Sequence, residues 1–303
     1  MPEFAGGDPS RAALVISSAL RARVESLLGH AVVSVARVAG GDINDAFELG
    51  LAGRRSVFLK THANAPLTMF DAEAAGLEFL REARALRVPE VLSVAPAGES
   101  APFLLLEFIR PGRPRPEFDV TLGRGLAALH RFGAPSFGFR AANFIGRLVQ
   151  DNREHTSWAE FYREQRLEPQ LRAAEAAGRA PLALRRKFER LFAKLPELVG
   201  EAESPARLHG DLWSGNVHVD EHGAPCLIDP AVYGGHREMD LAMMRLFGGF
   251  DERVFSAYAE AYPLAAGHAE RVHLYQLYPL LVHVNLFGGG YLSSVERALS
   301  EYL

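Results

Sequence analysis

The most specific pattern in the chain is Leu208-His209-Gly210-Asp211-Leu212-Trp213-Ser214-Gly215-Asn216-Val217, followed by Cys226-Leu227-Ile228-Asp229-Pro230-Ala231. Gly210 and Gly215 disfavour a helix, so we expect the first stretch to be a loop. The second stretch begins with an apolar run that is typical of a short strand. The pattern therefore predicts a polar loop followed by a strand that ends in a carboxylate.

Three polar side chains of this pattern favour phosphoryl transfer. Asp211 can orient and deprotonate an attacking hydroxyl, while Asn216 and Asp229 can hold Mg²⁺ on the phosphates of a nucleotide. Few oxygen ligands suit Mg²⁺, which completes its shell with water and phosphate. Alone, either aspartate is commonly a helix cap or a structural hydrogen-bonding group. The complete spacing favours the catalytic interpretation.

The chain before residue 110 alternates between helix and strand patterns. We expect a helix over 10–28, strands at 32–35, 43–49 and 56–60, a helix over 69–86, and strands at 90–94 and 103–109. Gly40 and Gly41 lie between two of these strands, where their amides can approach a phosphate. A glycine pair in this position is also typical of an ordinary hairpin.

Other residues of this part are candidates for binding ATP. Lys60 ends the third strand and is expected to reach the α and β phosphates, and Glu73 lies on the next helix, where it can pair with Lys60. Alone, each is typical of a surface residue, but the downstream loop favours the functional interpretation. Glu107, Phe108 and Ile109 end the last strand and are expected to form the hinge whose backbone recognises adenine.

The run from Pro111 to Pro116 predicts a boundary between two lobes, 1–110 and 111–303. After it we expect helices at 119–132, 157–177, 181–199, 238–247, 251–261, 271–287 and 290–301, with short extended pieces near 207–219 and 225–229. The predicted fold class is α+β, with a small β-rich N-terminal lobe that contains one main helix, and a larger, mainly helical C-terminal lobe.

Composition excludes several classes of protein. The 303 residues carry 33 Lys and Arg against 37 Asp and Glu, and this net charge of -4 disfavours a nucleic-acid partner. The single cysteine, Cys226, cannot form an intramolecular disulfide. Residues 272–295 lack charged side chains but include His, Asn and Pro, so we expect a buried helix and no membrane partner. No signal peptide is recognisable, and the protein is expected to be soluble and cytoplasmic.

The order of these features resembles the protein-kinase-like superfamily and, more closely, the fructosamine kinase (ketosamine 3-kinase) family. The resemblance is carried by residues 40–47, 70–77, 137–139, 143–146, 158–162, 165–167, 209–216, 229–242 and 247–250. The most specific runs are His-Gly-Asp-Leu-Trp-Ser-Gly-Asn at 209–216 and Gly-His-Arg-Glu-Met-Asp-Leu-Ala at 235–242.

The resemblance implies a two-lobed protein-kinase-like fold and a defined activity. Members of the family use ATP to phosphorylate the C3 hydroxyl of ketosamines such as fructosamine or ribulosamine adducts of lysine. By motif position, Asp211 would be the base, Asn216 and Asp229 the Mg²⁺ ligands, and Lys60 a phosphate contact.

Further positions concern the loop and the acceptor. His209 and Asp240 are expected to support the catalytic loop. Asp240 follows Asp229 by only eleven positions, which leaves little room for a peptide platform and favours a small substrate. Trp213 is a candidate to stack on a sugar and His283 to hydrogen-bond the substrate, although both residue types are also common in packing roles.

Two alternative functions stay open. Aminoglycoside or choline-type phosphotransferases share the loop but differ in the runs around it, and a non-catalytic nucleotide-binding protein would be expected to lose base or metal residues. The sequence does not identify the physiological acceptor, a free or protein-bound form of it, or the oligomeric state.

Overall fold

The computed structural model describes residues 16–38, 44–53, 56–66, 68–95 and 101–303. By their contacts, the residues form two compact units: Met1–Leu67 with Leu92–Phe108, and Thr68–Val91 with Ile109–Leu303. We call them the first and the second unit and describe each by itself. The predicted phosphate-binding glycines, Gly40 and Gly41, lie outside the described residues.

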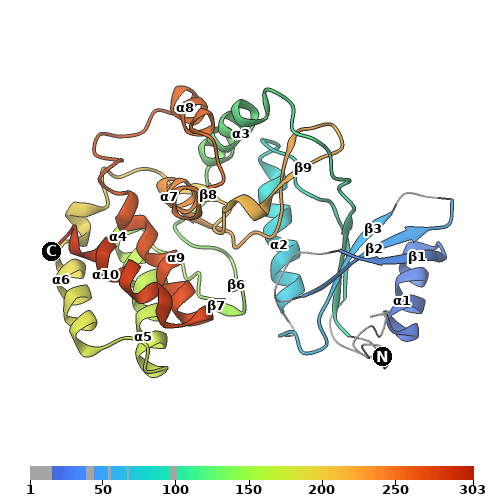
Figure 1. Ribbon diagram of the computed structural model, residues 1–303, viewed down its shortest axis with the longest axis horizontal. Coiled ribbons are helices and arrows are strands. Elements are labelled where there is room, and N and C mark those ends of the chain that lie inside the picture. Colours follow the sequence, from blue (N-terminus) through green and yellow to red (C-terminus); the bar gives the residue numbers. More distant parts are fainter. Residues whose placement is uncertain (1–15, 39–43, 54–55, 67, 96–100) are drawn as a thin grey trace, which may run out of the picture. The chain divides into compact units, whose positions relative to one another are not determined.

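The first unit is a five-stranded sheet with one helix against it (Figure 1). The sheet order is β1-β2-β3-β5-β4, with β1 Val32–Arg37, β2 Asp45–Leu51, β3 Val57–Thr61, β4 Val91–Ala95 and β5 Phe103–Glu107. Helix α1 (Ser18–Leu28) begins where the Ser17 hydroxyl accepts from the Leu20 amide and ends at Gly29, whose φ is +67°. Leu20 and Val24 bury the inner side of α1 against strand residues such as Leu49.

The second unit contains α2, the helix that the sequence places in the N-terminal lobe. Helix α2 (Met69–Glu82) packs against β6 (Asn143–Ile145), and a Cβ at Gly76 would lie 3.4–3.5 Å from Val232 and Pro230. Its contacts therefore join it to the segment that follows Asp229.

The remaining helices of the second unit are α3 Phe118–Phe132, α4 Trp158–Phe161, α5 Glu168–Ala176, α6 Leu182–Leu198, α7 Glu238–Phe247, α8 Glu252–Ala261, α9 Val272–Phe287 and α10 Leu292–Ser300. Helix α9 buries residues on all sides, as expected for the charge-free segment, and α5, α7 and α10 pack against it (Figure 1). No helix of the described residues is long and apolar enough to cross a membrane.

Short strand pairs position the loops of the second unit. They are β6 with β7 (Leu148–Gln150), β8 (Ala206–Leu208) with β11 (Tyr233–Gly235), and β9 (Val217–Val219) with β10 (Pro225–Leu227). The sequence predicts the extended pieces at β8, β9 and β10 but not β6, β7 or β11, because three-residue strands are too short for an alternating pattern.

The predicted single helix over 157–177 is wrong in its middle. A π-helical turn, Tyr162–Leu167, separates α4 from α5. This turn buries Arg166 completely, and such a turn inside a helical segment shifts the side chains that follow.

Candidate active site

Asp240, on α7, holds the loop after β8 through its backbone. Its Oδ2 accepts from the His209 amide at 2.8 Å, and its Oδ1 accepts from the Gly210 amide at 2.9 Å. Burial alone would raise the pKa of Asp240, but hydrogen bonds from His130 and the backbone lower it below its ordinary value. The carboxylate is therefore ionised at neutral pH, and it pairs with two backbone donors that would otherwise be buried without partners.

Two residues without a sequence signal position Asp240 from behind. His130 Nε2 lies 3.2 Å from Asp240 Oδ2, and His130 Nδ1 lies 2.8 Å from the Tyr258 hydroxyl. Because a carboxylate only accepts, His130 Nε2 carries the hydrogen. Since His130 lies in an ordinary apolar helix pattern on α3, the sequence gives no reason to select it.

His209 is fully buried and links the loop to the segment before Asp229. Its Nε2 donates to the Ile228 carbonyl at 2.9 Å, and its Nδ1 accepts from the Asp211 amide at 3.3 Å. Burial lowers the pKa of His209, which keeps the ring neutral and in this tautomer. His209 thus makes one hydrogen bond within the loop and one to the segment before Asp229.

Asp211 and Asn216 face one another within the loop. Asn216 Nδ2 donates to the Asp211 carbonyl at 2.7 Å and to Asp211 Oδ2 at 3.1 Å. Burial raises the pKa of Asp211 to about 7, the Asn216 hydrogen bond lowers it, and the charges of Asp229 and Asp240 raise it further. The Asp211 side chain is therefore oriented by an amide and poorly solvated on its inner side.

The backbone around Asp229 and Gly210 takes conformations that few residues tolerate. Asp229 has a φ of +53° and is one of only two non-glycine residues with positive φ in the described part of the chain. Gly210 has a φ of +83°, and a Cβ there would lie 2.0 Å from the Ala231 carbonyl oxygen. A glycine is required at 210 so that the loop and the segment after Asp229 can approach this closely.

A buried polar network supports that segment from its other side. Asn143 Nδ2 donates to the Val232 carbonyl at 2.8 Å, and Gln150 Nε2 donates to the Ala231 carbonyl at 3.1 Å. The Arg166 guanidinium donates to Asn152, which in turn donates to Asn143. Polar residues in short strands and a π-turn carry no sequence pattern of burial, so this network was not predicted.

Trp213 is the most exposed of the candidate residues in the loop, with 42% of its surface accessible. Its ring lies over Gly215, where a Cβ would approach a ring carbon to 2.1 Å. On the same loop, Ser214 contacts the turn after α7, since a Cβ at Gly249 would lie 2.6 Å from the Ser214 hydroxyl oxygen. The indole is thus packed on one side and accessible on another.

The candidates of the first part of the chain lie on the predicted kinds of element. Lys60 is buried in β3, in register with Ala46 and Leu104, and Glu107 ends β5. Glu73 lies on α2 in the second unit. The pairing of Lys60 with Glu73 stays a prediction.

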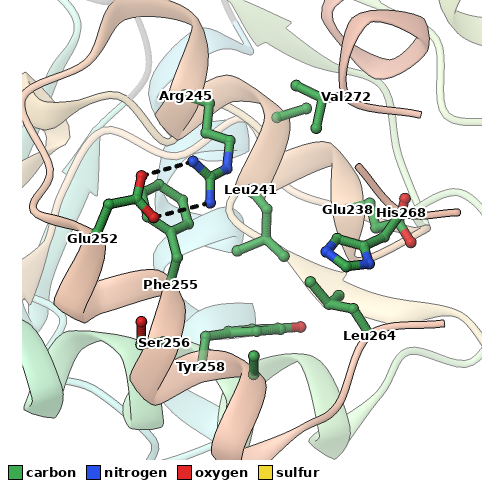
Figure 2. A pocket seen from close by; sticks show the side chains of 12 residues that line it. Glu238, Leu241, Arg245, Glu252, Phe255, Ser256, Tyr258, Leu264, His268 and Val272 are labelled. Carbon is green, nitrogen blue, oxygen red and sulfur yellow. Dashed lines mark hydrogen bonds and ion pairs between the residues drawn. The ribbon is translucent and has the colours of Figure 1, made fainter. Parts of the chain in front are cut away.

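A separate cavity of about 220 Å³ lies between α7, α8 and residues 264–272 (Figure 2). None of the residues predicted for catalysis or binding lines it. The Arg245–Glu252 ion pair, with an N–O distance of 2.9 Å, lies along its edge. Its wall includes Tyr258, whose hydroxyl contacts His130. We assign it no function.

The polar groups around Asp229 fit a metal ion that takes its remaining ligands from a nucleotide. Asn216 directs Nδ2 to Asp211, and no described residue donates to its Oδ1, which is therefore available as an oxygen ligand. Across the described ranges there is no group of three or more His, Cys, Asp or Glu residues that could hold a metal ion by themselves. An oxygen site with few protein ligands is typical of a metal bound together with phosphate.

A sheet-rich first unit and a mainly helical second unit define a protein of the protein-kinase-like fold class. The chain aligns with an aminoglycoside phosphotransferase of known structure over 94% of its own length and 99% of that chain, with a TM-score of 0.63 and 16% identity. A likeness at this level concerns the fold alone.

The chain belongs to the fructosamine kinase family, whose model matches residues 17–303. It is 40% identical to a probable ketoamine kinase of Enterococcus faecium over 88% of this chain and 94% of the relative. It is 38% identical to the chloroplastic protein-ribulosamine 3-kinase of Arabidopsis thaliana over 90% and 83% of the two chains.

A solved structure of high similarity is that of a Thermobifida fusca protein assigned as a fructosamine-3-kinase. It matches with 39% identity and a TM-score of 0.84, over 93% of this chain and 98% of the other. Family membership confirms the resemblance predicted from the sequence and makes the chain a kinase, which uses ATP and a divalent metal to phosphorylate a sugar hydroxyl.

Proposed function

We propose that this kinase phosphorylates the C3 hydroxyl of ketosamines, the adducts formed when a sugar reacts with an amine. The relatives described as ketoamine and ribulosamine kinases support this acceptor class. The observation that carries the proposal is the Asp211 carboxylate, which Asn216 orients inside a loop that Asp240 holds by its amides.

In this mechanism Asp211 accepts the proton of the acceptor hydroxyl. Its Oδ2 is fixed by Asn216, and the backbone at Gly210 is fixed by Asp240, so the carboxylate meets the hydroxyl without first being reorganised. The γ-phosphoryl group then passes in line from ATP to the oriented oxygen as its bond to the β-phosphate oxygen breaks, and ADP leaves.

Mg²⁺ is the metal we propose, held by Asn216 Oδ1 and the Asp229 carboxylate. When bound, it would neutralise charge on the β and γ phosphates. The left-handed backbone at Asp229 fixes where its carboxylate leaves the chain. Oxygen ligands of this number fit Mg²⁺ better than the softer metals.

The first part of the chain would bind the nucleotide. Lys60 would contact the α and β phosphates, with Glu73 as its partner, and the amides of Gly40 and Gly41 would approach the phosphates. The backbone from Glu107 through Phe108 to Ile109 would recognise adenine. The buried position of Lys60 in a central strand supports this assignment, because a lysine is rarely buried unless its ammonium group pairs with a group of opposite charge.

Trp213 would stack on the sugar ring of the acceptor beside Asp211. Its exposed indole lies in the same loop as the base, and aromatic faces bind the C–H faces of sugars. His283 is the second candidate for acceptor binding.

The proposed function is tested by coupled ADP release with a panel of glycated lysines, aminoglycosides and choline. Turnover on the ketosamines is expected. Turnover on aminoglycosides or choline, but not on ketosamines, would instead establish the alternative phosphotransferase function.

The role of Asp211 is tested by Asp211→Asn, which should reduce kcat at least about a hundredfold, the usual range for a general base. ATP affinity should stay near the wild-type value, because the proposed nucleotide contacts are elsewhere. Leu182→Ala, on an exposed side chain of α6, serves as the control with unchanged kcat. Wild-type turnover in Asp211→Asn would contradict the assignment.

A further inference from the structure

His283 presents a hydrogen-bond acceptor, its Nε2 atom, to which the proposed mechanism assigns no partner. Its Nδ1 lies 2.7 Å from the Pro279 carbonyl oxygen. A carbonyl only accepts, so Nδ1 carries the hydrogen. Burial lowers the pKa of His283 and keeps the ring neutral at pH 7. Nε2 therefore carries a lone pair, and no described residue donates to it.

Three aromatic rings surround this imidazole. The ring centroids of Phe247, Tyr291 and Phe287 lie 4.7, 5.0 and 5.3 Å from that of His283. Phe247 is 41% exposed and Phe287 is 58% exposed, which is unusual for phenylalanine. We call Phe247, His283, Phe287 and Tyr291 the aromatic patch.

The aromatic patch is built by two helix ends of the same sequence. Helix α7 ends in Leu-Phe-Gly-Gly at 246–249, and α9 ends in Leu-Phe-Gly-Gly at 286–289. Gly248 and Gly288 have φ values of +68° and +98°, and nothing lies within 4 Å of a Cβ built at either position. The backbone turns after each phenylalanine, and the space beside both glycines is open.

The turn that follows Phe247 of the aromatic patch contacts the loop at 209–216. The turn after Phe247 touches Ser214 at Gly249, and Ser214 follows Trp213 directly. This contact places the turn after α7 next to the loop that carries Asp211 and Trp213. The non-reacting end of an acceptor bound at this loop can extend toward the aromatic patch.

A neutral imidazole lone pair among aromatic faces has a defined chemical preference. It suits a positively charged N–H donor with apolar substituents, because the lone pair accepts the hydrogen and the rings attract the cation. A ketosamine carries such a group, a secondary ammonium between the sugar and the methylenes of the amine.

We propose that the aromatic patch binds the ammonium group and adjoining methylenes of the ketosamine, which makes His283, Phe247 and Phe287 specificity residues for the amine side of the acceptor. This inference rests on the proposed function. It assigns the amine side of the acceptor to His283, for which the sequence suggested only a hydrogen bond to the substrate, and keeps the sugar on Trp213, as the sequence suggested.

The test compares two acceptors that differ in one non-hydrogen atom. The first is the fructose adduct of the lysine side chain, and the second is its ether isostere, with oxygen in place of the ammonium nitrogen. Wild-type KM should be about tenfold lower for the amine, the scale of a charge-assisted hydrogen bond with cation–π attraction. His283→Phe should bring the two KM values close together by raising KM for the amine alone. Phe287→Ala should raise KM for the amine more than KM for the ether, because both acceptors carry the methylenes and only one carries the ammonium.

Controls separate the possible outcomes. Leu182→Ala, an exposed apolar side chain away from the aromatic patch, should keep the wild-type ratio. Retained turnover of the ether shows that each variant is folded. Equal rises in KM for both acceptors, or an unchanged ratio, would overturn the inference while leaving the proposed function intact. Absence of wild-type turnover on both acceptors would refute the proposed function itself.

Discussion

Replacing Asp240 by asparagine should unfold the second unit more easily, because three hydrogen bonds converge on the carboxylate. Its two oxygens accept from the His209 amide, the Gly210 amide and His130 Nε2. An asparagine supplies one oxygen and an NH₂ group. In the better of its two orientations the NH₂ faces the Gly210 amide, which then has no acceptor.

The expected loss in the free energy of unfolding follows from these contacts. One buried N–H without a partner costs about 1–3 kcal/mol, and each of the other two bonds loses about 1 kcal/mol when the acceptor becomes neutral. The expected loss in free energy of unfolding is therefore about 3–5 kcal/mol, a large part of the usual stability of a domain. Turnover should fall as well, because the amides that Asp240 holds position the backbone of Asp211.

Urea denaturation followed by tryptophan fluorescence measures this loss directly. Both tryptophans of the chain, Trp158 and Trp213, belong to the second unit, so the signal reports that unit alone. Glu252→Gln makes the same chemical change in an exposed ion pair and should cost less than about 1 kcal/mol. If Asp240→Asn cost no more than this control, the proposed support of the loop would be wrong.

Three other predictions concern stability and nucleotide binding. Burial lowers the pKa of His236 from 6.5 to about 4. The stability that depends on its neutral form is therefore fully present above pH 6.5 and is lost as the pH falls toward 4. Urea titrations should show that the free energy of unfolding falls by about 3 kcal/mol over this pH range in the wild type, and that this fall is absent in His236→Gln. An identical pH profile in the variant would exclude His236 as the cause. Gly210→Ala should lower the free energy of unfolding by about 2–4 kcal/mol, because the new Cβ meets the Ala231 carbonyl. Gly178→Ala, at a similar φ but with open space around it, should lower it by about 1 kcal/mol. Equal losses in the two variants would refute the close approach at Gly210. Lys60→Met should raise KM for ATP about tenfold or more without changing KM for the acceptor, and steady-state kinetics with an unaltered KM for ATP would contradict the assignment of Lys60.

The loop at 209–216 and helix α7 could be predicted from the sequence for a physical reason. Gly210 and Asp229 need unusual backbone angles, and the polar residues between them have few structural alternatives at that spacing. Helix α7 occupies the predicted residues 238–247, because an apolar pattern begins and ends there with clear boundaries. The charge-free helix was also predicted correctly as a buried one.

The supporting residues behind the loop could not be predicted in the same way. His130 lies in an apolar helix pattern, and its role depends on a contact with Asp240, far away in sequence. Arg166 belongs to a π-turn inside a segment with a continuous helical pattern, and its burial depends on the rings of Phe161 and Tyr233 beneath its guanidinium. Sequence periodicity indicates which side of a helix or strand is buried. It does not indicate which distant group forms hydrogen bonds with a buried polar side chain.

The single cysteine offers a practical route to measuring the distance between the two units. Cys226 lies in the middle of β10 and is completely buried, so its thiol is inaccessible to maleimide reagents in the native protein. A cysteine introduced at the exposed Val33 of the first unit and another at the exposed Leu182 of the second would then be the only accessible thiols. A dye pair on these two positions can report the distance between the units by energy transfer, in the presence and absence of ATP, without removal of the natural thiol.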